Sequence, residues 1–103
     1  MSVAESIDTI IRLLGSDDVL IQLAEESSEL SQACLKIVRN NGRNKAKVTI
    51  LKSYDNLHEE IADVLVALRV LQEYDLIDMD RVEEIADKKL VRWSNRLLGD
   101  WEE

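Results

Sequence analysis

The stretch VLIQLAEESSELSQACLKIV, residues 19–38, and the stretch HEEIADVLVALRVLQEY, residues 58–74, decide the fold of this chain. In both, apolar side chains recur three and four positions apart, which is the period of an α-helix that buries one face. At about 100° per residue, the apolar side chains of each region gather on one stripe. The stripes contain Val19, Leu23, Leu30, Ala33 and Ile37 in the first region, and Leu57, Val64, Ala67, Leu68, Val70 and Leu71 in the second. We therefore expect two long helices whose stripes face a shared interior.

Shorter helices are expected before and after this pair, which gives an all-α fold of four helices in a bundle-like arrangement. We expect helices over residues 3–14, from 16 or 17 to about 39, from 49 or 53 to 74, and from 78 or 80 to about 98, with a loop over residues 43–48. Residues that typically begin and end helices support these limits. They are Ser2 with Glu5, Ser16 or Asp17, and Asp78 or Asp80 with Glu83 at the starts, and Gly15, Asn40-Asn41-Gly42 and Gly99 at the ends.

The composition favours one small domain over residues 1–103. Apolar residues make up 46% and charged residues 33% of the chain, which is typical of a globular protein rather than a disordered one. Proline is absent and glycine occurs three times, so turn-rich β folds are disfavoured. A compact domain of this length has a radius of gyration of roughly 13 Å.

The charges and the apolar runs exclude several classes of function. With 13 basic and 21 acidic residues the net charge is −8, which disfavours binding to polymeric nucleic acid. The longest apolar run, residues 64–68, is far too short to span a membrane, and the N-terminal residues do not resemble a secretory signal. The single cysteine, Cys34, excludes an internal disulfide and suits a reducing compartment, so we expect a cytoplasmic protein.

Acidic residues occupy positions where the two long helices should be apolar. Glu26 and Glu60 fall in the middle of the two stripes, and Glu29 and Asp63 fall at their edges. None of these four has a lysine or arginine four residues further on, so helical ion pairs of the usual kind are missing. An ionised carboxylate in an apolar interior is costly unless it is paired or binds a metal.

Two such pairs that face each other would form a cage of oxygen ligands. Carboxylate oxygens suit Mg²⁺ or Mn²⁺ better than zinc or copper. The alternative is that these acidic residues simply form a solvated helix face, as most helical glutamates do. Both pairs lie on the apolar side and lack partners, and this favours the metal site.

The pattern Glu25-Glu26-x-x-Glu29, followed about thirty residues later by Glu60-x-x-Asp63, resembles the signature of the MazG-like all-α nucleoside triphosphate pyrophosphohydrolases. The flanking sequences are also similar to those of this family. LAEESSELSQA at 23–33 resembles its first motif helix, HEEIADVL at 58–65 its second, and KLVRW at 89–93 the basic stretch of its last helix. The resemblance extends over residues 20–97.

The resemblance implies a MazG-type protomer with two long motif helices and shorter terminal helices. It also implies an enzyme that cleaves a nucleoside triphosphate between its α- and β-phosphates and controls or cleans the nucleotide pool. On this basis the Mg²⁺ ligands are Glu26, Glu29, Glu60 and Asp63, the residue that orients water is Glu25, and the residues that hold the phosphates are Lys36, Arg39, Lys89 and Arg92. Glu26 would serve catalysis as well as metal binding.

Two other functions remain open from the sequence. The first is a helical regulatory module that binds a nucleotide or a partner without hydrolysis. The second is an enzyme like the phosphoribosyl-ATP pyrophosphohydrolase of histidine synthesis, which shares the first motif type. A pyrophosphate assay would separate the first of these from a hydrolase.

Apolar residues on the outer faces of the helices predict self-association. Ile21, Leu35 and Leu65 point away from the acidic side of the long helices, and Trp93 lies on an apolar stripe of the last helix. Exposed apolar patches usually mark interfaces. We therefore expect a homodimer or a dimer of dimers, and the resemblance points to the same assembly. For Trp93 a place in the core or in a subunit interface is expected rather than base stacking.

Overall fold

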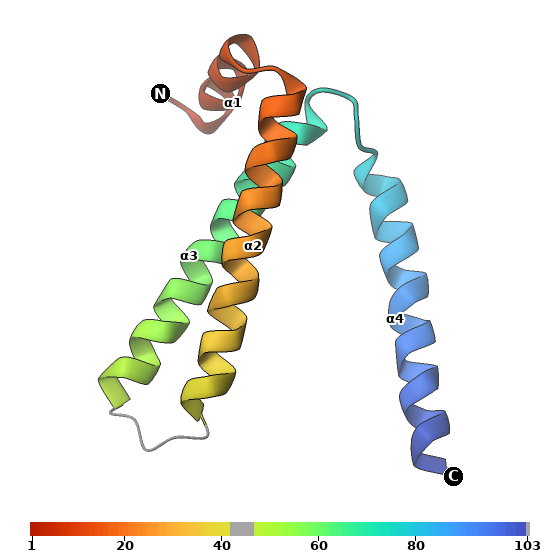
Figure 1. Cartoon of the computed structure of the whole chain (residues 1–103). Coiled ribbons are helices and arrows are strands. Elements are labelled where there is room, and N and C mark those ends of the chain that lie inside the picture. Colours follow the sequence, from red (N-terminus) through yellow and green to blue (C-terminus); the bar gives the residue numbers. More distant parts are fainter. Residues whose placement is uncertain (42–46, 103) are drawn as a thin grey trace.

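The protein is all-α in the computed structural model, which describes residues 1–41 and 47–102 and the side chains of residues 1–41 and 49–99. Its helices are α1 (Val3–Leu13), α2 (Ser16–Asn41), α3 (Lys47–Gln72) and α4 (Met79–Glu102), and no strand occurs in the described ranges (Figure 1). The predicted stop at Gly42 and most of the predicted loop over residues 43–48 lie outside the described residues. None of the helices so described carries an apolar stretch long enough to cross a lipid bilayer.

Two helix starts lie where the sequence predicts them. The Ser2 side chain accepts a hydrogen bond from the backbone N–H of Glu5, at 3.1 Å, and so caps α1. At α4, Asp78 Oδ1 accepts from the backbone N–H groups of Asp80 and Arg81, at 3.0 and 3.2 Å. Each cap satisfies backbone donors that have no partner within the helix.

Other helix ends differ from the prediction. Neither Ser16 nor Asp17 caps α2, because the helix already begins at Ser16 and the side chain of Asp18 reaches back to accept from Gly15 N–H at 3.0 Å. Leu14, in an extended conformation, ends α1, and none of the described glycines has a positive φ. Helix α4 continues through Gly99, since a single glycine costs a helix only about 1 kcal/mol.

The ends of α3 differ from the prediction as well. The helix starts at Lys47 rather than at residue 49 or 53, and it ends at Gln72, two residues before the predicted limit. Asp75 adopts a left-handed conformation with φ 56° just beyond the end of the helix. Aspartate tolerates this conformation better than most residues, so it turns the chain away from the helix axis.

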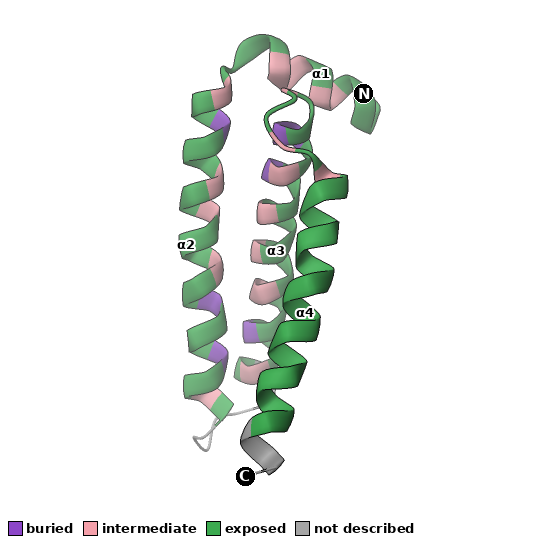
Figure 2. Cartoon of the chain, turned by 90° about the vertical axis from the view of Figure 1, so that its right-hand side faces the viewer, coloured by how far each residue is buried: buried purple, intermediate pink, exposed green. Residues whose placement is uncertain are grey.

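The core lies between α2 and α3, which run side by side and antiparallel (Figures 1 and 2). The buried apolar residues of both helices belong to the two predicted stripes. The buried ones are Val19, Ala33 and Ile37 on α2, and Ala67, Val70 and Leu71 on α3. Ser53 is also buried, where its hydroxyl accepts from Asn40 Nδ2 and donates to the Thr49 carbonyl, both at 3.0 Å.

Helix α1 closes one end of the α2–α3 pair. Ile10 of α1 packs on the buried cluster of Val19, Val70 and Leu71. The Tyr74 hydroxyl donates to the carbonyl of Leu14 at 2.7 Å, so the end of α3 is tied to the turn between α1 and α2. These contacts hold α1 at the end of the helix pair where α2 begins and α3 ends.

Helix α4 stands apart from the other three, so the chain has the four predicted helices but the predicted bundle-like packing of the last one is not confirmed (Figure 1). With 24 residues it is nearly as long as α2 and α3, and every described side chain from Asp80 onward is exposed. The radius of gyration is 18.0 Å rather than about 13 Å for the same reason. Trp93 is 57% exposed and is therefore not part of a core within the chain.

Candidate metal centre

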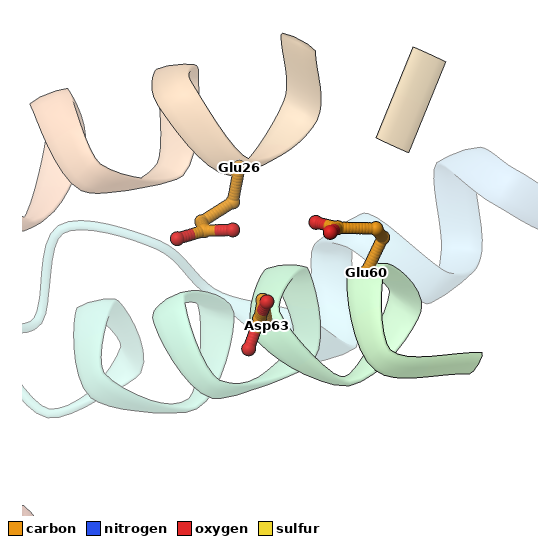
Figure 3. Close-up of side chains that lie close together, drawn as sticks. All are labelled: Glu26, Glu60 and Asp63. Atoms are coloured by element: carbon orange, nitrogen blue, oxygen red, sulfur yellow. The ribbon is translucent and has the colours of Figure 1, made fainter. Parts of the chain in front are cut away.

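Three carboxylates converge in the middle of the α2–α3 pair. Glu26 extends from α2 toward α3, and Glu60 and Asp63 extend from successive turns of α3 into the same space (Figure 3). One oxygen atom of each lies within 4.8 Å of those of the other two. Carboxylate oxygens gathered this closely could hold one metal ion between them.

The helical period explains why these side chains meet. Glu26 lies one turn from Leu23 and one turn from Leu30 on the inner side of α2, and all three are half-buried. Glu60 holds the equivalent place on α3 and is also half-buried, whereas Asp63 is more exposed. Because these carboxylates lie on the same helix faces as the apolar residues that pack, they point into the space between α2 and α3.

Two oxygens of this cluster are buried without a hydrogen-bond partner, namely Oε2 of Glu26 and Oε2 of Glu60. The other oxygen of Glu26 accepts from Gln22 Nε2 at 2.7 Å. A buried oxygen without a donor costs free energy of folding, the more so when it is charged. Buried carboxylate oxygens of this kind could be satisfied by a hard divalent cation.

The environment raises the pKa of Glu26 above its ordinary value of 4.5. Burial is the largest cause, because it disfavours the charged form of the side chain. The negative charges of Asp63 and Glu29 raise the pKa further, while the hydrogen bond from Gln22 lowers it. Without a cation, the cluster therefore holds Glu26 less readily in its ionised form.

The structure brings together three of the four predicted ligands. Glu29 is exposed and lies outside the group, although it is close enough to Glu26 to influence the pKa of that side chain. Glu25, the residue predicted to orient water, is exposed on α2. Both belong to the first motif, but the group of three close carboxylates includes neither.

None of the four predicted phosphate-binding residues pairs with the carboxylates. Lys36 and Arg39 are exposed ten and thirteen residues beyond Glu26, which is about 15 and 20 Å along the axis of α2. Lys89 and Arg92 are exposed on α4. Among the side chains that the structure describes, the one ion pair is Lys88–Glu84, at 3.6 Å within α4.

A pocket of about 450 Å³ adjoins the acidic group on the side of α1. Glu26 and Asp63 line one end of it, and Ile10 and Val70 are among its apolar walls. Asp18 and Gln22 complete its polar lining, and the sequence interpretation did not single them out. Their spacing of four residues, at 18, 22 and 26, is the signal that could have linked them to Glu26.

Comparisons of the chain with protein-family models, with curated proteins and with solved structures find no match.

Proposed function

We propose that this protein is a Mg²⁺-dependent pyrophosphohydrolase that converts a nucleoside triphosphate to the monophosphate and pyrophosphate. The proposal is carried by two findings on the same residues. Glu26 and Glu60 each have a buried oxygen without a hydrogen-bond partner, and one carboxylate oxygen of each lies within 4.8 Å of the other and of one oxygen of Asp63. Apolar neighbours hold these oxygens in place, so their desolvation is a property of the fold. The type of reaction is inferred from the resemblance of the two acidic motifs to those of the MazG-like family.

Glu26, Glu60 and Asp63 would hold the cation, with Mn²⁺ as a substitute for Mg²⁺. When bound, the cation neutralises phosphate charge and lowers the pKa of a water molecule. Glu29 lies one turn from Glu26 and would join the ligand set after a change of side-chain rotamer. Glu25, on the solvent side, is the candidate to orient the attacking water.

The basic residues of α4 would contribute to the same reaction by holding the phosphates. Lys89 and Arg92 lie ten and thirteen residues after Met79, where α4 begins. Asp63 and Glu60 lie nine and twelve residues before Gln72, where α3 ends. At about 1.5 Å per residue, these side chains are level with each other along the two helices. A sideways approach of an α4 helix would therefore bring basic residues opposite the acidic group.

A panel of ribonucleoside and deoxyribonucleoside triphosphates tests the proposal. The protein is incubated with each of them and with phosphoribosyl-ATP in the presence of Mg²⁺, and released pyrophosphate is measured. We expect pyrophosphate from at least one triphosphate, and a loss of roughly a hundredfold or more in Glu26→Gln. Glu73→Gln, the same change at an exposed residue of the α3–α4 turn, should keep the activity.

Each outcome of the panel has one meaning. Binding of a triphosphate without release of pyrophosphate would favour the non-catalytic module and overturn the enzyme. Cleavage of phosphoribosyl-ATP alone would place the protein with the histidine-synthesis enzyme. Equal activity in the Glu26→Gln variant would remove the acidic group from the mechanism.

A further inference from the structure

Gln22 contacts the acidic group formed by Glu26, Glu60 and Asp63, although it belongs to neither acidic motif. Its Nε2 donates to Glu26 Oε1 at 2.7 Å, at the short end of the range for an N–H···O hydrogen bond. The two residues are one turn apart on α2, so this bond forms within a single helix. The other oxygen of Glu26, Oε2, is buried without a partner. The bond from Gln22 therefore leaves one oxygen of Glu26 for a cation.

This hydrogen bond sets the direction of the Glu26 carboxylate. Because α2 and α3 are antiparallel, Gln22 lies toward the end of the pair where α2 begins, whereas Glu60 lies toward the opposite end (Figure 1). One oxygen of Glu26 is held by Gln22, and Figure 3 shows one oxygen of Glu26 turned toward Glu60 and the other turned away from it. Without the donor, the side chain of Glu26 would be free to enter other rotamers. Gln22 therefore favours the one direction that suits a shared ion.

A neutral amide suits this task better than a charged donor. A lysine or arginine at position 22 would also donate to Glu26, but its positive charge would compete with a cation for the carboxylates. Gln22 donates without adding charge, and it lines the same pocket as Glu26 and Asp63. Residues that orient a metal ligand by a hydrogen bond, without binding the metal themselves, typically change the metal affinity roughly ten- to hundredfold when they are replaced.

We infer that Gln22 is a positioning residue of the metal centre, which holds the Glu26 carboxylate in its metal-binding direction through the hydrogen bond from Nε2 to Oε1. Gln22 acts through Glu26 and touches neither the metal ion nor the reacting phosphate. The inference rests on the proposed function for the presence of the metal ion. It goes beyond that proposal because it assigns part of the metal affinity to a residue outside the carboxylates.

Gln22→Met removes the donor and keeps the length of the side chain and a good helix-forming residue. The dissociation constant of Mn²⁺ is measured by calorimetry on the full chain without nucleotide. We expect the variant to bind Mn²⁺ about tenfold more weakly, at the lower end of the range because Gln22 is exposed. Gln32→Met makes the same change at an exposed position on another face of α2, and it should bind Mn²⁺ as tightly as the wild type.

The dependence of activity on Mg²⁺ distinguishes positioning from a role in folding or in the chemical step. We expect the Mg²⁺ concentration for half-maximal activity to rise about tenfold in Gln22→Met. Excess Mg²⁺ should then restore most of kcat, because a weakened site is still filled when the ion is abundant. A kcat that stays low at saturating Mg²⁺ would overturn the positioning role.

The binding measurement keeps this inference separate from the proposed hydrolase, because it needs no substrate. Weaker Mn²⁺ binding in Gln22→Met but not in Gln32→Met would support the positioning role even if no triphosphate is cleaved. Equal dissociation constants in the wild type and Gln22→Met would overturn that role and leave the hydrolase unaffected. Equal losses in Gln22→Met and Gln32→Met would also overturn it, and a wild type that does not bind Mn²⁺ would overturn both proposals.

Discussion

Glu26 occupies a place between α2 and α3 where an apolar side chain would stabilise the helix pair more. Its neighbours on the inner face, Leu23 and Leu30, show what the position normally holds. The cost is compounded because Glu60 and Asp63 approach it with the same charge. Three like charges this close together oppose folding, which supports the proposal that they bind a cation.

Removing one of these charges should separate stability from activity. For Glu60→Gln and Asp63→Asn we expect the helical circular dichroism spectrum to be kept, the Tm of the metal-free protein to be equal or higher, and the activity to fall roughly a hundredfold or more. Millimolar Mn²⁺ should raise the Tm of the wild type by several degrees but not that of the variants. Glu59→Gln, at the exposed neighbouring position, is the control for a general charge effect. A wild-type Tm that does not respond to Mn²⁺ would contradict a centre built from these residues.

The raised pKa of Glu26 predicts a pH dependence of stability. Because the folded state binds this proton more tightly than the unfolded chain, the contribution of Glu26 is most favourable below its ordinary pKa of 4.5 and is lost as the pH rises through the higher folded value. The free energy of unfolding of the metal-free wild type should therefore fall, relative to Glu26→Gln, across this window. Urea unfolding of both proteins between pH 4 and pH 7 measures the difference. A constant difference over this range would contradict the burial of the charge.

At the scale of the helices, the period of the sequence predicts the buried faces because a stripe depends only on neighbouring positions. The predicted stripes of α2 and α3 contain all six of their buried apolar residues. Glu29 and Asp63 show where this reasoning ends. Both lie about 60° from the centre of their stripes, yet Asp63 joins the acidic group and Glu29 stays exposed outside it. The difference arises from how the two helices lie against each other, which no single helix encodes.

Helix ends were predictable where a side chain caps the backbone beside it. Ser2 and Asp78 act locally, and both caps are present. Gly99 does not end α4, because a glycine permits a helix to stop but does not require it. Asp18 was not predicted as a pocket residue for a related reason. The pocket that it lines forms only because residues of α1 and α3 come together beside α2.

At the scale of the molecule, the fold of one chain does not explain what stabilises α4. Its stripe of apolar residues is exposed, and an isolated helix gains little stability without tertiary packing. Residues 88–99 of α4 are basic, with Lys88, Lys89, Arg92 and Arg96 and no acidic residue, whereas residues 17–30 of α2 carry only acidic charges. The two surfaces are complementary in charge, and within one chain they do not meet.

We propose that the partner is a second copy of the chain, because it would supply both surfaces at once. Each α4 would pack its stripe against the α2–α3 pair of the other chain, and Lys89 and Arg92 would then lie opposite the partner's acidic group. Isologous contacts of this kind close with twofold symmetry and leave no free surface of the same type. We therefore expect a sedimentation-equilibrium mass of two or four times the 11.8 kDa of one chain at micromolar concentration.

Trp93→Lys should reduce this mass to that of one chain, because it places a charge in the centre of the α4 stripe, and it should lower the activity with it. Asn95→Lys adds the same charge on the opposite side of α4, so both mass and activity should remain as in the wild type. A wild-type mass near 11.8 kDa would exclude the dimer and leave the basic residues of α4 without access to the acidic group. A Trp93→Lys protein that remains dimeric would show instead that the chains associate through the outer faces of α2 and α3, where Ile21, Leu35 and Leu65 are exposed.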